Sequence, residues 1–234
     1  MTVSVWRAAG AEALGTAALL SIVVGSGIMG ASLSAGNDGQ ALLLNALCTG
    51  AGLWVLITTL APVSGAHLNP VVSAVAVLTG SLGRTRLIPY VFAQVGGALV
   101  GVAVAHAMFG LPLAQTSTHA RGGANLALSE VVATFGLVFV VLAGGRVAPS
   151  RTPLLVASYV VSAYGFTAST AFANPAVTLA RAFTDTFAGI QGADVPLFIA
   201  AQGLGATLAT FAAAWLYRGV DVGSTGSDAD APTR

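Results

Sequence analysis

Charged residues fall into short clusters along this chain, and long uncharged runs separate the clusters. The runs without Asp, Glu, Lys or Arg cover residues 13–37, 39–83, 87–120, 131–145 and 152–180. A helix needs roughly 20 apolar residues to cross the ~30 Å hydrocarbon core of a bilayer. The pattern therefore predicts six membrane-spanning helices, near residues 8–30, 41–62, 87–109, 126–145, 153–172 and 196–217.

Two further apolar segments are too short to cross. They run from Pro70 to about Gly80 and from Pro175 to about Phe187, and each begins with an Asn-Pro pair. At ~1.5 Å rise per residue, a helix of this length reaches about half-way through the bilayer. Short interrupted segments at matching places in two halves are typical of an inverted repeat with a site at the midplane. We therefore expect two re-entrant half-helices.

Other polar residues repeat in the same order. A glutamate opens the first and fourth spans, and a glutamine lies inside the third and sixth. The order Glu, Asn-Pro, Gln thus occurs twice, at Glu12, Asn69, Gln94 and at Glu130, Asn174, Gln202. The prediction is an all-α membrane protein with one domain over residues 1–234, whose repeats cover about 8–109 and about 126–217.

Composition narrows the function classes. The chain is 56% hydrophobic and only 7% charged, whereas a soluble domain carries about 25% charged residues. A net charge of +1 argues against a nucleic-acid partner. Cys48 is the one cysteine, so an intrachain disulfide is excluded. The histidines show no metal-ligand spacing, and we expect neither a metal nor a cofactor, and no enzymatic activity.

All basic residues are arginines, and their positions predict the orientation. Seven lie on the side shared by both termini: Arg7, Arg84, Arg86, Arg146, Arg151, Arg218 and Arg234. Only Arg121 and Arg181 lie on the other side. Cytoplasmic loops carry the excess of basic residues, so both termini are predicted in the cytoplasm, with the chain in the plasma (inner) membrane. Residues 219–234 are small and polar, and are predicted to be disordered.

The Asn-Pro pairs favour a pore for neutral solutes. Asn is a preferred N-cap and Pro a preferred first helical residue, so Asn69 and Asn174 would cap half-helices while their amide NH₂ groups donate into a lumen. Two positive helix ends at that point oppose cations. Glu12 and Glu130 are either proton-relay residues or acceptors for loop N–H groups at membrane depth; the second interpretation is favoured. His67 is interpreted as a loop-packing or pore-mouth residue.

The stretches "SGAHLNP" and "ANPA" resemble the two boxes of the major intrinsic protein family, the aquaporins and aquaglyceroporins. The resemblance covers about residues 8–217. It implies an hourglass of six spans and two half-helices, with a pore in each subunit of a homotetramer. The boxes are Asn69-Pro70-Val71 and Asn174-Pro175-Ala176, and Val71 departs from the usual alanine.

A second departure concerns the outer selectivity filter. Family members usually place an arginine directly after the second box, where this chain has Val177. The family spacing assigns Thr49, Ser162 and Ala171 to the rest of the filter, which would make it wide and uncharged. Arg181, one helical turn after Val177, is either a displaced positive residue at the outer mouth or the partner of Asp185 in a solvated ion pair.

A small, arginine-free filter resembles that of a bacterial branch associated with arsenic resistance. The resemblance implies passive flux of water, glycerol, arsenite as As(OH)₃ and methylated arsenicals. The alternatives are a water- or glycerol-selective aquaporin, a secondary transporter built on the inverted repeat, and a structural membrane protein with a closed pore.

Overall fold

The computed structural model describes residues 3–220, and all regular structure within that range is helical. Its α-helices are α1 (Val5–Leu33), α2 (Asp38–Ser64), α3 (Pro70–Leu78), α4 (Leu87–Met108), α5 (Ala124–Val147), α6 (Thr152–Phe166), α7 (Pro175–Ala180) and α8 (Val195–Leu216). Single 3₁₀ turns occur at η1 (Arg84–Arg86), η2 (Pro149–Arg151), η3 (Arg181–Phe183) and η4 (Gly192–Asp194). The all-α prediction is confirmed.

Five helices in the described range are long and apolar enough to cross a membrane: α1, α2, α4 with η1, α5, and α8 with η4. The fifth expected span, 153–172, is wrong at its C-terminal end. Helix α6 has only 15 residues, about 22 Å of helix. The helix ends at Phe166 because Thr167 has an extended backbone, and the helix cannot resume before the second Asn-Pro pair because Thr170, Ala171 and Ala173 have positive φ angles.

Small residues let the long helices approach closely. Helix α1 packs most extensively against α4, and α5 against α8. A β-carbon at Gly97 in α4 would collide with the carbonyl oxygen of Ala13 in α1, and one at Gly205 in α8 would collide with that of Val131 in α5. These glycines therefore serve backbone packing, as expected for helices in lipid.

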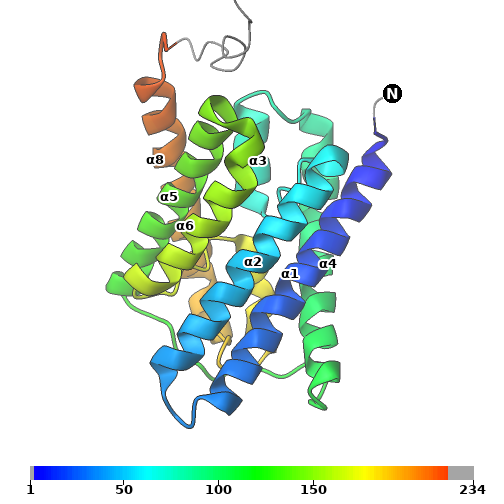
Figure 1. The fold of residues 1–234 in the computed structure, drawn as a ribbon, viewed down its shortest axis with the longest axis vertical. Coiled ribbons are helices and arrows are strands. Elements are labelled where there is room, and N and C mark those ends of the chain that lie inside the picture. Colours follow the sequence, from blue (N-terminus) through cyan, green and yellow to red (C-terminus); the bar gives the residue numbers. More distant parts are fainter. Residues whose placement is uncertain (1–2, 221–234) are drawn as a thin grey trace, which may run out of the picture.

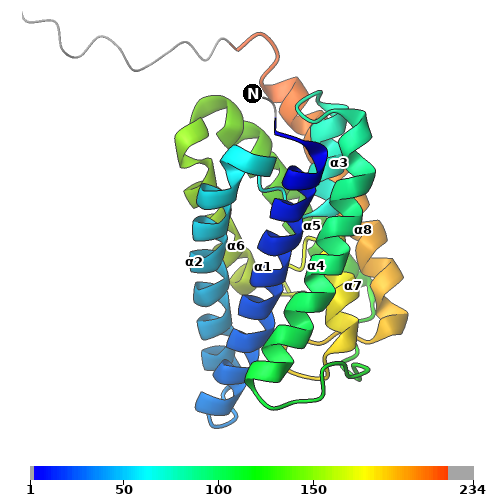
Figure 2. The ribbon, with the colours of Figure 1, turned by 90° about the vertical axis from the view of Figure 1, so that its right-hand side faces the viewer.

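The two short helices lie inside the bundle and contact each other as well as α4 and α8. Figure 2 shows α3 in the upper half of the bundle and α7 in the lower half. The start of α1 and the end of α8 lie at the same end of the molecule (Figure 1). Of the tail predicted to be disordered, residues 221–234 lie outside the described range.

Candidate functional site

The two Asn-Pro pairs start the short helices. Asn69 and Asn174 have extended backbones at the N-cap positions, and each proline is the first helical residue. The side-chain oxygen of Asn69 accepts a hydrogen bond from the Val71 N–H at 3.0 Å. That of Asn174 accepts from the Ala176 N–H, also at 3.0 Å. The caps hold both side chains at the meeting point of α3 and α7.

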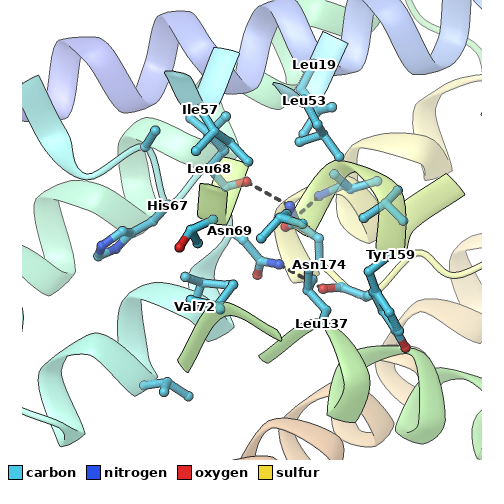
Figure 3. A pocket seen from close by; sticks show the side chains of 18 of the residues that line it. Leu19, Leu53, Ile57, His67, Leu68, Asn69, Val72, Leu137, Tyr159 and Asn174 are labelled. Atoms are coloured by element: carbon cyan, nitrogen blue, oxygen red, sulfur yellow. Dashed lines mark hydrogen bonds between the residues drawn. The ribbon is translucent and has the colours of Figure 1, made fainter. Parts of the chain in front are cut away.

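The amide nitrogens of the same side chains bind the opposite loops. Asn69 Nδ2 donates to the Ala173 carbonyl at 2.8 Å, and Asn174 Nδ2 donates to the Leu68 carbonyl at 2.8 Å (Figure 3). An amide NH₂ has two donor hydrogens. One amide hydrogen of each asparagine therefore bonds to the loop that precedes the opposite half-helix, and the second hydrogen is left to donate into the lumen. The sequence interpretation, in which the whole NH₂ group was free, is corrected on this point.

The loops before the asparagines share an unusual backbone. Residues three and one positions before each asparagine have positive φ: Ala66 and Leu68 in the first loop, Ala171 and Ala173 in the second. Such conformations cost of order 1–3 kcal/mol each for residues with a side chain. They persist only where the surroundings hold them, and two buried glutamates do so here.

Glu12 holds the first loop. Its Oε1 accepts from the His67 N–H at 2.9 Å and the Ser64 hydroxyl at 2.6 Å. Its Oε2 accepts from the Leu68 N–H at 2.6 Å and from Gln94 Nε2 at 2.8 Å. The carboxylate is fully buried, and its two oxygens are occupied by donors.

Glu130 holds the second loop in the same way. Its Oε1 accepts from the Phe172 N–H at 2.9 Å, and its Oε2 from the Ala173 N–H at 2.9 Å. Gln202 Nε2 donates to Oε2 at 2.6 Å. Neither Glu130 nor Glu12 lines the central cavity. The geometry favours loop support over proton relay.

A cavity of about 360 Å³ runs past both asparagines. Its walls are mainly apolar, and no carboxylate side chain of the described residues lines it. Thr79, Ser81 and Thr152 lie along the part near the C-terminal end of α3 and the start of α6, while Thr49, Val177 and Arg181 lie along the other part. A solute with hydroxyl groups thus meets isolated donors between apolar surfaces. Figure 3 shows Leu53, Ile57, Val72 and Leu137 around the two asparagines.

Three of the four expected filter residues, Thr49, Ala171 and Val177, line the cavity. The expectation for Ser162 is corrected, because this residue is exposed on α6 and does not line the cavity. Its neighbours Ala163 and Tyr164 do. One residue along a helix turns the side chain by about 100°, so a small error in the assumed loop length moves the assignment to the outer face.

The cavity lining also includes an aromatic residue, Tyr164, and a charged residue, Arg181, whereas the sequence predicted an uncharged filter of small residues. The Tyr164 hydroxyl donates to the Thr49 hydroxyl at 3.4 Å. Arg181 is only 2% exposed and lines the cavity. The interpretation of Arg181 as a solvated partner of Asp185 is wrong. Asp185 accepts instead from the backbone N–H and the hydroxyl of Thr118, at 2.8 and 2.9 Å, and these bonds lower the pKa of its carboxyl.

Comparison with known proteins identifies this arrangement. The model of the family described as "Major intrinsic protein" matches residues 1–158, more than half of the chain. The chain is a major intrinsic protein. Members of this family, the aquaporins and aquaglyceroporins, are membrane channels.

Relatives of this major intrinsic protein include aquaglyceroporin AqpS of Rhizobium meliloti (strain 1021), 53% identical over 206 residues that cover 88% of each chain. The probable aquaporin TIP2-2 of Oryza sativa subsp. japonica is 31% identical over 180 residues, 71% of each chain. The aquaglyceroporin structure from Plasmodium falciparum superposes with a TM-score of 0.72 at 22% identity, covering 93% of this chain and 97% of that one. The fold of this major intrinsic protein is therefore that of an aquaglyceroporin.

For two cavity-lining residues of this major intrinsic protein, Tyr164 and Arg181, the sequence contains features that indicate a place at the cavity. Tyr164 is the aromatic residue two positions after Ser162 in an otherwise small-residue stretch. Arg181 ends a 29-residue run without charge, from 152 to 180, and its spacing of four from Val177 placed it on the same helical face. The sequence gives no comparable indication for Phe172, whose ring centroid lies 3.4 Å from the Arg181 guanidinium carbon.

Proposed function

We propose that this protein is a passive channel for small uncharged solutes. The solutes are water, glycerol and metalloid acids, the latter as uncharged arsenite and methylated arsenicals. They pass Thr49, Ala171 and Val177 at the outer filter, and the asparagine pair at the midplane. The observation that carries the proposal is the cavity, with apolar walls, two amide donors and, among residues 3–220, no carboxylate along it.

The positions of the glutamates support passive flux over coupled transport. A secondary transporter needs an ionisable group that exchanges protons or ions with the substrate pathway. Glu12 and Glu130 lie outside the cavity lining and accept hydrogen bonds from the loops instead. Within the part of the chain that the structure describes, the cavity therefore has no carboxylate that could couple solute to a proton gradient.

The side chains at the filter support solutes wider than water. Ala171 and Val177 offer small apolar surfaces, and Thr49 offers one hydroxyl. Methyl groups suit such walls, while the hydroxyls of glycerol or As(OH)₃ still reach the free hydrogens of Asn69 and Asn174. The relative AqpS carries the name aquaglyceroporin, which agrees with a polyol-sized pathway.

The proposal includes a homotetramer in the plasma membrane with both termini in the cytoplasm. Large apolar side chains lie exposed on the outside of the bundle, among them Trp54, Phe92, Phe211 and Trp215. Such a surface suits contact with lipid and with neighbouring subunits. The distribution of arginines supports the orientation.

Stopped-flow measurements on proteoliposomes test the proposal. Water, glycerol, urea, arsenite and methylarsenate are applied in turn, with and without a proton gradient. We expect non-saturating flux that does not respond to the gradient. Val177→Trp should block glycerol because residue 177 lines the cavity, whereas Ala214→Trp, on the exposed face of α8, should not. Saturable uptake driven by protons would overturn the proposal.

A further inference from the structure

Arg181 is a buried cation with no acidic partner among the described residues. No ion pair within 4.0 Å joins it to a carboxylate in residues 3–220. Its Nε donates to the Ala188 carbonyl. Nη1 and Nη2 of Arg181 make no hydrogen bond to a described residue. They are not fully buried either, because neither is among the fully buried polar atoms that lack a partner. Because Arg181 lines the cavity, its two terminal nitrogens are available to a solute there.

The guanidinium is held in place by an aromatic ring. The Arg181 guanidinium carbon lies 3.4 Å from the centroid of the Phe172 ring. That ring packs edge-on against Phe198, with centroids 5.2 Å apart, and the backbone N–H of Phe172 is fixed by Glu130. Cation–π contact and the Ala188 carbonyl together define one position for the charge. A long flexible side chain is thereby converted into a fixed part of the wall.

A second arginine lies near the same ring but has another environment. The Arg121 guanidinium carbon lies 5.1 Å from the Phe172 centroid. Its Nε donates to the Gly189 carbonyl at 2.7 Å, and its backbone N–H to Asp194 Oδ2 at 2.7 Å. Arg121 does not line the cavity. The two arginines thus share a ring, and only Arg181 faces the solute pathway.

We infer that Arg181 sets the charge selectivity of the outer half of the pathway; the inference rests on the proposed channel function. The fixed guanidinium repels cations where water is scarce and electrostatic forces are weakly screened. Its terminal N–H groups donate to the oxygens of neutral solutes. Because the charge stands at position 181 and not at 177, the filter at Val177 stays wide while the pathway still excludes cations.

Urea and guanidinium provide the test, because they are planar molecules of nearly equal size that differ in charge. Wild-type protein in proteoliposomes should pass urea and exclude guanidinium. Arg181→Gln keeps a donor for the Ala188 carbonyl but removes the charge. It should raise guanidinium flux by roughly tenfold or more, with urea flux changed by less than about twofold. Arg181→Lys should keep guanidinium out, and so should the matched control Arg121→Gln.

Each outcome decides between the two proposals. If wild type passes neither urea nor glycerol, the channel proposal fails. If wild type passes urea and guanidinium equally well, or if Arg181→Gln stays closed to guanidinium while passing urea, the channel stands and the role of Arg181 is overturned. Arg181→Met is the second neutral variant in case Arg181→Gln does not fold. If neither folds, the wild-type ratio decides, and a ratio of urea to guanidinium flux below about ten rejects the inference.

Discussion

Replacing Glu130 with Gln tests whether this buried acid is part of the scaffold. The carboxylate accepts three hydrogen bonds, from Phe172, Ala173 and Gln202. A glutamine keeps one acceptor oxygen and places an NH₂ group against the remaining donors. If its oxygen takes the place of Oε2, it still accepts from Ala173 and Gln202, Gln202 keeps its bond to the Thr178 hydroxyl, and the NH₂ group faces the Phe172 N–H. One backbone N–H then stays unsatisfied, at about 1–3 kcal/mol, and the remaining bonds lose their charge assistance.

We therefore expect Glu130→Gln to lose about 2–4 kcal/mol of unfolding free energy. The Ala173 carbonyl binds Asn69 Nδ2, so the loosened loop should also reduce water flux per folded protein. Denaturant unfolding in detergent and stopped-flow light scattering measure the two effects. Asp185→Asn is the matched control, because it removes an exposed carboxylate and should leave the unfolding free energy nearly unchanged. Wild-type stability together with a changed pH dependence of flux would refute the scaffold role and favour a proton relay.

Three further predictions follow from single contacts. Val177→Arg should narrow the cavity and lower glycerol flux roughly tenfold, which corresponds to about 1.4 kcal/mol of added barrier, and water flux less; equal losses for both solutes would remove Val177 from the filter. Gly97→Ala should lower the thermal midpoint by several degrees, while Gly96→Ala, with open space around its α-carbon, should not; equal midpoints would contradict the close packing. Thr118→Val removes one of the hydrogen bonds that lower the pKa of Asp185, so NMR titration should show a higher pKa for this carboxyl. On acidification, the stabilisation from the ionised carboxylate should then be lost at a higher pH than in the wild type. An unchanged pKa would exclude the Thr118 hydroxyl as a cause.

The hydrophobic pattern of the sequence predicts the ends of the helices well where a charged residue lies at the end. Arg84 and Arg86 precede α4, and Arg146 lies in the last turn of α5. The end of α6 has no such mark. Ala171 and Ala173 continue the apolar run. The backbone of Ala173 is held by bonds to Glu130 and Asn69, which are distant in sequence, and Thr170 and Ala171 before it also have positive φ. Tertiary contacts override the local pattern there, so the sequence predicted a span that was too long.

The site shows the same division between local and distant causes. Asn69 and Asn174 could be assigned from sequence because capping by an Asn-Pro pair is local chemistry. The environment of Arg181 could not, because its contacts are the Phe172 ring and a carbonyl in the loop after η3. The spacing to Asp185 favoured a surface pair, and burial beside Phe172 prevented it.

The two loops share a backbone but differ in the residue two positions before the asparagine. In the first loop this is His67, whose Nδ1 lies 3.0 Å from the Ser73 hydroxyl and whose ring packs edge-on against Tyr90. In the second loop it is Phe172, whose ring carries Arg181. Matched glutamates hold the loops alike, so the midplane donors are nearly symmetric. Among the described residues, the Phe172 ring on that common scaffold holds the Arg181 guanidinium at one half of the cavity, and His67 occupies the matching place in the other loop, so the two halves of the cavity differ chemically although their loops are alike.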